Sequence, residues 1–371
     1  MDSLRPETRA ARSCPALHPL KIFDAARTAD RFVYASAPMV RYSKLAFRQT
    51  VHEYGVDLSW TPMILSKEFN RSQIARDSDF TTTRNANPTI VQFGANDPQE
   101  LSRAASLVSP FANGVDLNCG CPQSWACAAS LGAALMDRRE LVRDMVAETR
   151  ETLARDGWER SRESERGKSV SVKIRVHKDL RKTFDFMNTV IGNPHEPLVD
   201  FVTIHPRTRS TPSTTPINTE ALSLLASEFG PKIPLILSGD VSTLPDPPIP
   251  TPSDSTEQPR PSTTHIAGLM SARALLCNPA LFAGHATCPW SAVESFMRNV
   301  ARAPIPLRLV QHHLSEMCGP GMGPQKSALL DRKERGLLLK LESMLDVVDY
   351  MDGMIALKTG RVGGLSRVRE A

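Results

Sequence analysis

Three cysteines, Cys119, Cys121 and Cys127, lie within nine residues of a chain that has only seven. Such a group could bind a metal, form a disulfide, attack a substrate or donate a proton. A zinc site needs about four ligands, commonly in paired spacing, and no matching pair occurs elsewhere in the sequence. A disulfide between Cys119 and Cys121 would be strained. We therefore predict no metal site, and we interpret Cys121 as a positioned thiol that is either a nucleophile or an acid.

The composition is that of an ordinary enzyme, with 41% hydrophobic and 23% charged residues in 371. No run approaches the roughly 18 apolar residues that a membrane span requires, so we expect a soluble protein. An odd number of cysteines and no secretory leader predict free thiols in an intracellular compartment, the cytoplasm or the nucleus. The net charge of +5 allows a polyanionic partner without requiring one. A monomer is favoured, although the sequence does not fix the oligomeric state.

Eight short, almost unbroken apolar runs alternate with helical patterns. Runs of this kind are typical of parallel strands buried on both faces. Eight such units predict a (β/α)8 TIM barrel. An open doubly wound sheet is the alternative, which we disfavour because no Gly-rich turn follows the first strand. The predicted strands are 31–37, 56–61, 89–94, 114–118, 169–175, 201–205, 234–239 and 266–270, with helices at 43–54, 97–108, 138–155, 180–191, 219–229 and 278–284.

The barrel is flanked by segments of different character. We expect a flexible tail at 1–18, the barrel at 19–288 and a helical domain at 289–371, with helices at 290–302, 306–317 and 329–352. Residues 245–264 contain seven prolines where the seventh barrel helix should lie. Because proline is excluded from helix interiors, we interpret this stretch as a disordered insertion or a degenerate helix.

Most of the predicted strands lead into polar or reactive residues. In a barrel, functional side chains lie at the carboxyl ends of the strands, so these residues should meet at one mouth. They are Pro38 and Met39, Gln92, Asn118 and Cys121, Lys173 and Arg175, His205 and Arg207, Ser238, Gly239 and Asp240, and Ala272 and Arg273.

Each of these residues alone has an ordinary structural explanation, and His205 alone would be a hydrogen-bonded core histidine. Lys173 is different, because its strand should be buried on both faces and its charge needs a partner or the mouth. The amides of Gln92 and Asn118 beside a cation fit the polar edge of a ring cofactor such as a flavin. Turns near Arg273 offer backbone N–H groups for a phosphate. Together these residues favour a phosphate-bearing ring cofactor over a plain sugar phosphate.

Eight stretches resemble the flavin-dependent tRNA-dihydrouridine synthases, and the motif Asn-Cys-Gly-Cys-Pro is the most specific of them. The segments PQSWA and HKDLRKT most resemble those of the eukaryotic class that acts on D-loop uridines 20a and 20b. The stretches are APMVRYSKLAFR (37–48), TPMI (61–64), VQFGANDP (91–98), DLNCGCPQSWA (116–126), VKIRVHKDLRKT (172–183), TIHPRT (203–208), SGD (238–240) and GLMSARALLCNPALF (268–282).

The resemblance implies an FMN-binding barrel, a helical domain that helps to grip tRNA, and NADPH as the reductant. Cys121 would then be the general acid that protonates C5 of uracil as hydride reaches C6. This fits thiol chemistry, because an unperturbed thiol with a pKa of about 8.5 is mostly protonated at pH 7. Asn118 would bind the uracil or the flavin. The implied flavin contacts are Pro38 and Met39 along the ring, Gln92 and Lys173 at its pyrimidine edge, His205 beside it, and Ser238, Gly239, Asp240, Ala272 and Arg273 around the phosphate.

Basic residues around the mouth and in the helical domain are candidates for the tRNA backbone, although most of them individually could be solvated surface charges. They are Arg41, Lys44, Arg48, Arg175, Lys178, Arg181, Lys182, Arg207 and Arg209, with Arg308, Lys326, Arg332 and Lys333. The chain departs from the family pattern at Ser238, usually Asn, at Pro206, usually Gly, and in the Pro-rich stretch.

Two other functions remain open. A flavin barrel could reduce a small enone or oxidise dihydroorotate, and would need neither the helical appendage nor a basic mouth. A catalytically silent RNA-binding barrel is the second alternative, although the expected acid and flavin ligands are all present in the sequence.

Overall fold

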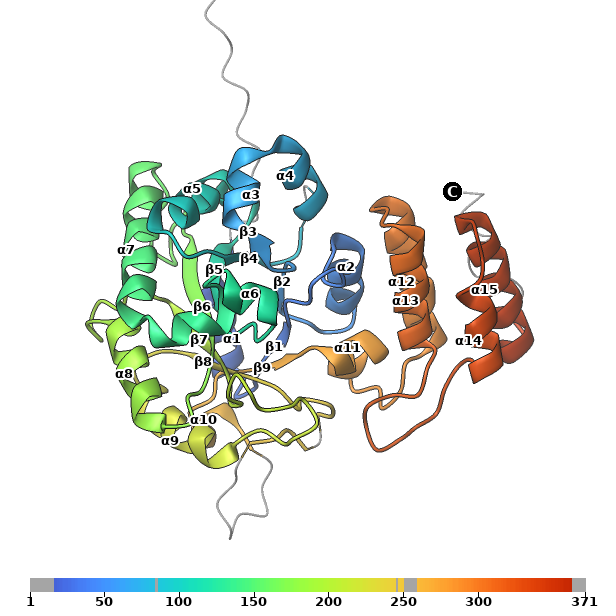
Figure 1. Cartoon of the computed structure of the whole chain (residues 1–371). Helices are drawn as coiled ribbons and strands as arrows, with labels where there is room; N and C mark the ends of the chain where they lie inside the picture. The colour runs from blue at the N-terminus through green and yellow to red at the C-terminus, as the bar shows by residue number, and fades with distance from the viewer. Residues whose placement is uncertain (1–16, 84–85, 245, 250–258, 362–371) are drawn as a thin grey trace, which may run out of the picture.

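A closed ring of parallel strands forms the centre of the protein (Figure 1). The computed structural model describes residues 17–83, 86–244, 246–249 and 259–361. The order β2-β1-β9-β8-β7-β6-β5-β4 closes through pairing of β2 with β4, and the short β3 extends the far end of β4. This confirms the (β/α)8 barrel over the open sheet. The strands are β1 (Val33–Ser36), β2 (Leu58–Trp60), β3 (Ile64–Leu65), β4 (Thr89–Gly94), β5 (Gly114–Cys119), β6 (Ser169–Arg175), β7 (Phe201–His205), β8 (Leu235–Ser238) and β9 (Gly268–Ser271).

The amino-terminal end of the ring is closed by packed side chains. Helix α1 (Pro19–Thr28) places Ile22 and Phe23 against apolar strand residues, including Trp60 and Phe201, in one buried cluster. Because successive strand residues point to opposite faces, the alternate residues form the core between the strands and the surrounding helices. The carboxyl ends of the strands are therefore the end at which a site can form.

The helices around the barrel follow the predicted pattern in most places. The helix predicted at 97–108 is confirmed as α5, and Asp97 caps it by accepting a hydrogen bond from Glu100 N at 2.9 Å. The barrel helices are α1, α2 (Leu45–Glu53), α3 (Ser66–Arg71), α4 (Gln73–Asp79), α5 (Pro98–Val108), α6 (Ser124–Ala128), α7 (Arg139–Arg155), α8 (Leu180–Ile191), α9 (Thr219–Phe229), α10 (Pro261–Thr264) and α11 (Arg273–Cys277), with 3-10 turns at Ser109–Phe111, Gly132–Asp137 and Leu281–Ala283.

The helix predicted at 278–284 is wrong. The helix there is α11, which ends at Cys277, and only a 3-10 turn at Leu281–Ala283 follows. Asn278 precedes Pro279, and a residue before proline is pushed out of the helical region. The sequence reading also missed α3 and α4, two short helices that lie between β3 and β4.

The two segments expected to lack regular structure fall partly outside the described residues. Of the predicted tail, residues 1–16 lie outside them, and His18 caps α1 by accepting a hydrogen bond from Leu20 N at 3.1 Å. Of the Pro-rich stretch, residues 245 and 250–258 also lie outside. The part that follows contains α10, a single turn of helix at the place of the seventh barrel helix.

Four further helices pack beside α2, at the right of Figure 1. They are α12 (Trp290–Arg302), α13 (Leu307–Met317), α14 (Arg332–Leu338) and α15 (Met344–Thr359). Asn299 on α12 donates to Thr50 Oγ1 at 3.1 Å and to Glu53 Oε1 at 2.9 Å on α2. Apolar residues of these helices join the barrel's outer core in one cluster. In the part of the chain that the structure covers, no helix is long and apolar enough to cross a membrane.

The single helix predicted at 329–352 is wrong, because two helices occupy this region. The second helix starts with its own capping box: Ser343 Oγ accepts from Asp346 N, and the Asp346 carboxylate accepts from Ser343 N, both at 3.1 Å. A residue that caps a helix has non-helical backbone angles. Ser343 therefore ends any continuation from α14 and begins α15.

A buried histidine lies between the C-terminal helices and the barrel. The His313 ring of α13 lies among Tyr42, Phe47 and Phe296, with ring centroids 5.2, 5.2 and 4.7 Å away. Neither ring nitrogen forms a hydrogen bond of normal geometry with any residue of the described ranges. Burial lowers the pKa of His313 from 6.5 to about 3. The imidazole is therefore neutral in the folded protein, with only the Tyr42 backbone opposing the effect of burial.

Replacing this histidine should stabilise the protein. His313→Leu removes two buried polar atoms, which cost about 1–3 kcal/mol when they are unsatisfied. Because the folded-state pKa lies below the unfolded value, wild-type stability is complete above about pH 6.5 and declines as the pH falls toward 3. The gain in melting temperature should therefore grow from pH 8 to pH 5. His312→Gln, at an exposed neighbour, is the control, and a gain that does not change with pH would contradict this explanation.

Candidate active site

The carboxyl ends of the strands bring the predicted polar residues to one mouth. In the strand ladders, Asn118 is level with Lys173, Lys173 is level with Thr203, and Arg175 is level with His205. The alternation of the strands turns Asn118 and Lys173 toward the interior of the barrel. Pro38 and Met39 follow β1, Ser238, Gly239 and Asp240 follow the end of β8, and Ala272 and Arg273 follow β9.

The backbone of Cys121 is held from several sides. Asn118 Oδ1 accepts from Cys121 N at 2.8 Å, and Ala133 N donates to Cys121 O at 2.9 Å. Gly132 has a φ of +62°, and a Cβ there would lie 2.6 Å from Cys121 O, so only glycine fits. Arg175 Nε donates to Gly120 O at 2.8 Å. The half-buried thiol of Cys121 therefore stands on a rigid loop at the mouth.

The other two cysteines of the cluster have different surroundings. Cys119 is fully buried in the core between strands and helices, and burial raises its pKa well above 9.0, with the charge of Asp116 adding to the effect. Cys127 is half-buried and lies 3.8 Å from Cys121 O through its sulfur. All three are free thiols. Within the described ranges, no group of three or more His, Cys, Asp and Glu side chains could hold a metal ion.

The ammonium group of Lys173 has no hydrogen-bond or ion-pair partner among the described residues. Within the described part of the chain, its ammonium group makes no hydrogen bond or ion pair, although the side chain is half-buried. Burial lowers the pKa of Lys173 to about 8, and the cation of Arg175 adds to this, while Asp116 and Cys121 oppose it. The neighbouring Thr203 hydroxyl is buried and also lacks a partner among the described residues. Two interior polar groups are thus available to a ligand with hydrogen-bonding edges.

His205 cannot serve as an acid at this mouth. Burial lowers the pKa of His205 to about 2, and the cations of Lys173, Arg175, Arg207 and Arg273 add to the effect. Arg207 lies 2.9 Å from His205 Nε2, and because a guanidinium can only donate, this nitrogen accepts. The imidazole therefore stays neutral across the physiological range.

The two arginines predicted to bind substrate are engaged with the loops of the mouth. Arg175 is buried and donates to Gly120 O and Thr208 O, both at 2.8 Å. Arg207 is 4% exposed, and its guanidinium contacts both carboxylate oxygens of Asp240 at 2.5 and 2.7 Å. These contacts give both residues a positioning role, and binding of substrate by them stays a prediction.

The predicted phosphate region is formed by a strained turn and a short helix. Gly239 and Asp240 follow β8 with φ values of +108° and +55°. A Cβ at Gly239 would lie 2.7 Å from the His205 ring, so the turn can approach this closely only with glycine. Ser238 is buried, whereas Arg273 is exposed at the start of α11. The turn at Gly239 and Asp240 therefore brings backbone groups near the cation of Arg273, an arrangement that suits a phosphate.

Ser43, in the loop after β1, and Arg48, on α2, have structural roles that were not predicted from the sequence. Ser43 Oγ accepts from Met39 N at 2.9 Å and donates to Ala37 O at 2.8 Å, which fixes the loop after β1. The expectation that Arg48 contacts tRNA phosphate is wrong. Arg48 is 3% exposed and donates to Ser43 O and Thr81 O, both at 2.8 Å, so it supports the loop from within.

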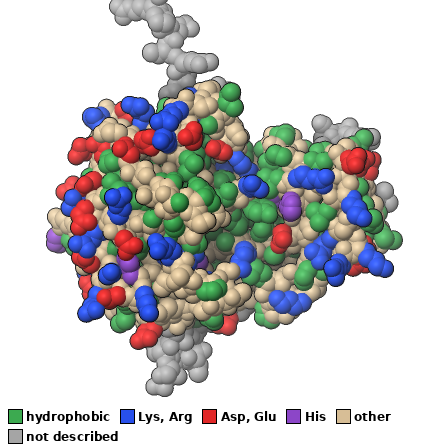
Figure 2. Space-filling model, in the orientation of Figure 1, with side chains coloured by type: hydrophobic (Ala, Val, Ile, Leu, Met, Phe, Trp, Pro, Cys, Tyr) green, Lys and Arg blue, Asp and Glu red, His purple; other side chains and the backbone are tan. Residues whose placement is uncertain are grey.

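Exposed cations and one exposed indole surround the mouth. Figure 2 shows Lys and Arg side chains spread over the barrel and the C-terminal helices on this face, with hydrophobic side chains gathered between the two parts. Arg41, Lys178, Arg209 and Arg273 are exposed on the loops after the strands. Trp125, on α6, is 46% exposed only four residues after Cys121.

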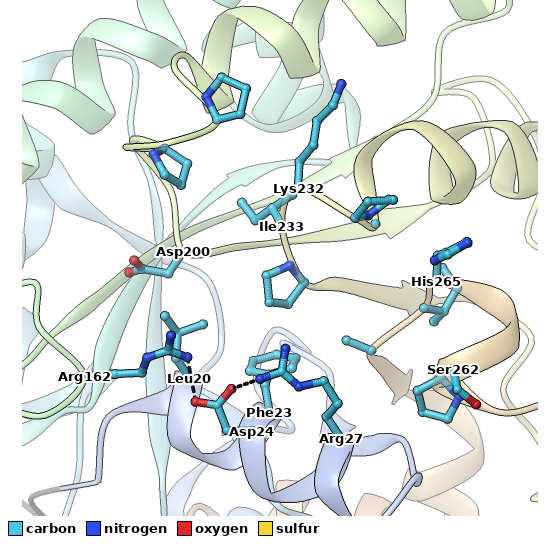
Figure 3. Close-up of a pocket in the computed structure, with 18 of the residues that line it drawn as sticks. Leu20, Phe23, Asp24, Arg27, Arg162, Asp200, Lys232, Ile233, Ser262 and His265 are labelled. Atoms are coloured by element: carbon cyan, nitrogen blue, oxygen red, sulfur yellow. Dashed lines mark hydrogen bonds and ion pairs between the residues drawn. The ribbon is translucent and has the colours of Figure 1, made fainter.

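A cavity of about 850 Å³ lies at the other end of the barrel, where Leu20 and Phe23 of α1 meet the segments that precede the strands (Figure 3). Within its lining, Asp24 pairs with Arg27 at 2.7 Å and with Arg162 at 2.6 Å, and Arg31 pairs with Asp57 outside the lining at 2.7 Å. None of the predicted site residues lines this cavity. The chemistry therefore belongs to the opposite mouth.

Comparison with known proteins gives a consistent result. The family model "Dihydrouridine synthase (Dus)" matches residues 35–327, the barrel and part of the C-terminal helices. A Schizosaccharomyces pombe protein named tRNA-dihydrouridine(20a/20b) synthase is 38% identical, with 90% of this chain and 91% of the relative covered. A human protein named as similar to that synthase is 35% identical, with 90% and 93% covered, and the Saccharomyces cerevisiae synthase is 33% identical, with 90% and 82% covered. The family match over most of the chain and a barrel mouth built around Cys121 lead to one conclusion: this chain belongs to the dihydrouridine synthase family.

Proposed function

We propose that the protein reduces the C5=C6 bond of uridines 20a and 20b in the D loop of tRNA, with FMN as its cofactor and NADPH as the electron donor. The proposal is carried by the half-buried thiol of Cys121 beside the cation of Lys173, which has no partner among the described residues, at the barrel mouth. Relatives that share 33–38% identity are named for this activity.

The residues of the mouth suit a flavin. Lys173 and Thr203 offer polar atoms that find no partner among the described residues, as expected of groups that meet the polar edge of a ring. Gln92 faces the same interior from β4, where its amide is bonded to Asp116 and Asn118, and Pro38 and Met39 would provide apolar contact. The phosphate would lie near Ser238, Gly239, Asp240, Ala272 and Arg273. When bound, FMN supplies the hydride that is added to C6 of uracil.

Cys121 completes the reaction by donating its proton to C5. Addition of hydride at C6 places negative charge on C5, C4 and O4, and the thiol proton neutralises it while the sulfur takes the charge. His205 cannot take this role, since the pKa of about 2 leaves its ring without the extra proton. Lys173 holds positive charge near the cofactor, and Asn118 fixes the loop that carries the acid.

The target uridine must leave its stacked position in tRNA to reach this mouth. Exposed cations at Arg41, Lys178 and Arg209, and at Lys326 and Lys333 in the C-terminal helices, can contact the phosphate backbone. We propose that residues 19–288 form the catalytic barrel and 289–371 a tRNA-binding domain. As a tRNA-modifying enzyme the protein would act inside the cell, in the cytoplasm or the nucleus, and as a monomer.

Trp125 should contribute a stacking surface for a tRNA base beside the target. Its ring is 46% exposed at the mouth, whereas Trp60 is fully buried and Trp158 is covered by Arg166 and Lys168. Stacking of a base on an aromatic ring is worth about 1–3 kcal/mol, so Trp125→Ala should lower kcat/KM for tRNA roughly tenfold or more.

The rate of flavin reduction by NADPH should not change in Trp125→Ala, because the indole is directed to the tRNA. Trp125→Phe keeps an aromatic face and should retain most of the activity. Leu224→Ala is the matched control, since Leu224 is 50% exposed on the outer helix α9, away from the mouth. Equal kcat/KM values for Trp125→Ala and wild type would refute the stacking role.

Purified protein distinguishes the three candidate functions. The proposal predicts a yellow protein that releases FMN on denaturation and reduces unmodified tRNA in the presence of NADPH. A yellow protein that reduces a small enone or oxidises dihydroorotate but leaves tRNA unchanged would be a small-molecule oxidoreductase. A colourless protein that binds tRNA would be a binding module.

A further inference from the structure

We propose that Asp116 is a positioning residue for the reduction: its carboxylate sets the orientation of Gln92 and Asn118, and through them the place of Cys121. The inference rests on the proposed function. Asp116 is fully buried inside the barrel on β5, level with Gln92 of β4 and with Ser171 of β6. No step of the reaction described above uses it.

Three side chains form a continuous chain of hydrogen bonds from the interior of the barrel to its mouth. Gln92 Nε2 donates to Asp116 Oδ2 at 2.7 Å, and Asn118 Nδ2 donates to Gln92 Oε1 at 2.7 Å. Asn118 Oδ1 accepts in turn from Cys121 N at 2.8 Å. Every bond in the chain is short, and Gln92 and Asp116 are fully buried.

The direction of this chain is set by Asp116. An amide side chain can be turned either way round with nearly the same shape, but an ionised carboxylate can only accept. Gln92 must therefore turn its NH2 group toward Asp116 and its carbonyl toward the mouth. That carbonyl requires the NH2 group of Asn118, which leaves the Asn118 carbonyl facing Cys121 N. One fixed charge thus selects one of two orientations at both amides.

Burial of the ionised Asp116 carboxylate inside the barrel is energetically unfavourable. Burial raises the pKa of Asp116 from 3.8 to about 6, although hydrogen bonds from Ser171 and Gln92 and the cation of Lys173 lower it. The next residue of this row, Phe201 of β7, lies level with Ser171 and is apolar. An apolar residue would serve packing at least as well, so the carboxylate is better explained by its effect on the mouth.

Protonation of Asp116 should release this control. Four groups face the Asp116 carboxyl: Gln92 from β4, Ser171 and Lys173 from β6, and the Trp60 indole from β2. The indole N–H makes no hydrogen bond of normal geometry with the described residues. Below about pH 6 the neutral carboxyl can donate to Gln92 Oε1, which reverses both amides. Cys121 N–H would then face an NH2 group, and the acid loop would lose its anchor.

Three variants test this role on the FMN-loaded enzyme. Asp116→Leu replaces the acceptor by a larger branched apolar side chain, Asp116→Asn can still accept but carries no charge, and Ser171→Ala removes the other bond to Asp116 but leaves Gln92 paired. For each variant, kcat and KM with tRNA are measured from pH 5 to pH 8. The rate at which iodoacetamide alkylates Cys121, followed by peptide mass spectrometry, and the affinity for FMN are measured in parallel.

Asp116→Leu should lower kcat about tenfold or more, with a smaller change in KM, and should alter the rate of Cys121 alkylation. The melting temperature of wild type should fall as the pH rises from about 4 to about 6, because the folded-state pKa lies above the unfolded value, and Asp116→Leu should lack this fall. Ser171→Ala should lose less activity than Asp116→Leu. Asp116→Asn should have a kcat at pH 8 between those of wild type and Asp116→Leu, because its amide can turn either an acceptor or a donor toward Gln92, and it should lack the decline near pH 6 that wild type shows.

Two results would overturn the inference. One is an Asp116→Leu enzyme with wild-type kcat and wild-type alkylation of Cys121. The other, decisive even if Asp116→Leu does not fold, is an Asp116→Asn enzyme that retains the decline near pH 6. Failure of the proposed function is a separate outcome, because the wild-type enzyme itself would then form no dihydrouridine.

Discussion

Replacing Cys121 by alanine is expected to abolish dihydrouridine formation while the protein keeps its fold and its FMN. General acid catalysis contributes about 10²–10⁴-fold to a rate, and the neutral His205 cannot substitute for the thiol. The variant should therefore lose at least about 100-fold in kcat, with little change in melting temperature, since the half-buried thiol contributes little to the core. NADPH should still reduce the flavin, because that step does not need the proton donor at C5.

A distant thiol provides the control for this variant. Cys288→Ala removes a buried cysteine that lies just before α12 and should leave the reduction of tRNA unchanged. Cys121→Ser, whose hydroxyl is a much weaker acid, should fall close to Cys121→Ala. If Cys121→Ala kept activity within tenfold of wild type, the assignment of the acid would be wrong.

Replacing Asp240 by alanine is expected to destabilise the protein by about 3–5 kcal/mol, the usual effect of removing one partner of a buried ion pair. The Arg207 side chain is only 3% exposed, and it would be left without a counter-charge. Asp240 also accepts from Ile217 N at 2.9 Å, so the variant loses an anchor for the loop after β7. Because Gly239 and Asp240 form the turn that faces the predicted phosphate, FMN affinity should fall together with stability.

The test is chemical denaturation of the variant beside matched controls. Asp144→Ala removes the exposed pair with Arg143 within α7 and should change stability by less than about 0.5 kcal/mol. A double variant with Arg207→Met and Asp240→Leu should recover part of the loss, since no unpaired charge remains. A loss below about 1 kcal/mol for Asp240→Ala would show that the pair is not what holds this loop.

The barrel could be predicted from the sequence because each strand can be recognised from its own short run of residues. Runs such as 234–239 and 266–270 are largely apolar on both faces, a pattern typical of buried parallel strands. The rule that functional residues follow strand ends then located the mouth, including Cys121 and Lys173. The break between α14 and α15 was not predicted, although Ser343 and Asp346 have the spacing of a capping box.

The contacts within the mouth could not be predicted, because they join distant parts of the chain. Nothing local to Arg207 indicates that it would pair with Asp240, 33 residues away, instead of facing the substrate. Arg48 looked like a surface cation, yet its guanidinium reaches carbonyl groups of two loops and is buried. Asp116 reads as an ordinary strand residue until its neighbours on β4 and β6 are known.

The cysteines illustrate both sides of this difference. Strand alternation alone separates Cys119, which points outward into the core, from Asn118, which points inward. The loop that presents Cys121 depends on Gly132 and Ala133, more than ten residues later in the chain. The sequence thus singled out Cys121 as the candidate acid, but only the structure explains why its backbone is rigid.

The most direct test of the proposed function is a position-resolved measurement of dihydrouridine in an unmodified tRNA transcript incubated with the purified protein and NADPH. The predicted result is a mass increase of two hydrogens at uridines 20a and 20b, absent when Cys121→Ala replaces the wild type. A transcript that remains unreduced at both positions, although the protein holds FMN and NADPH reduces it, would contradict the proposal.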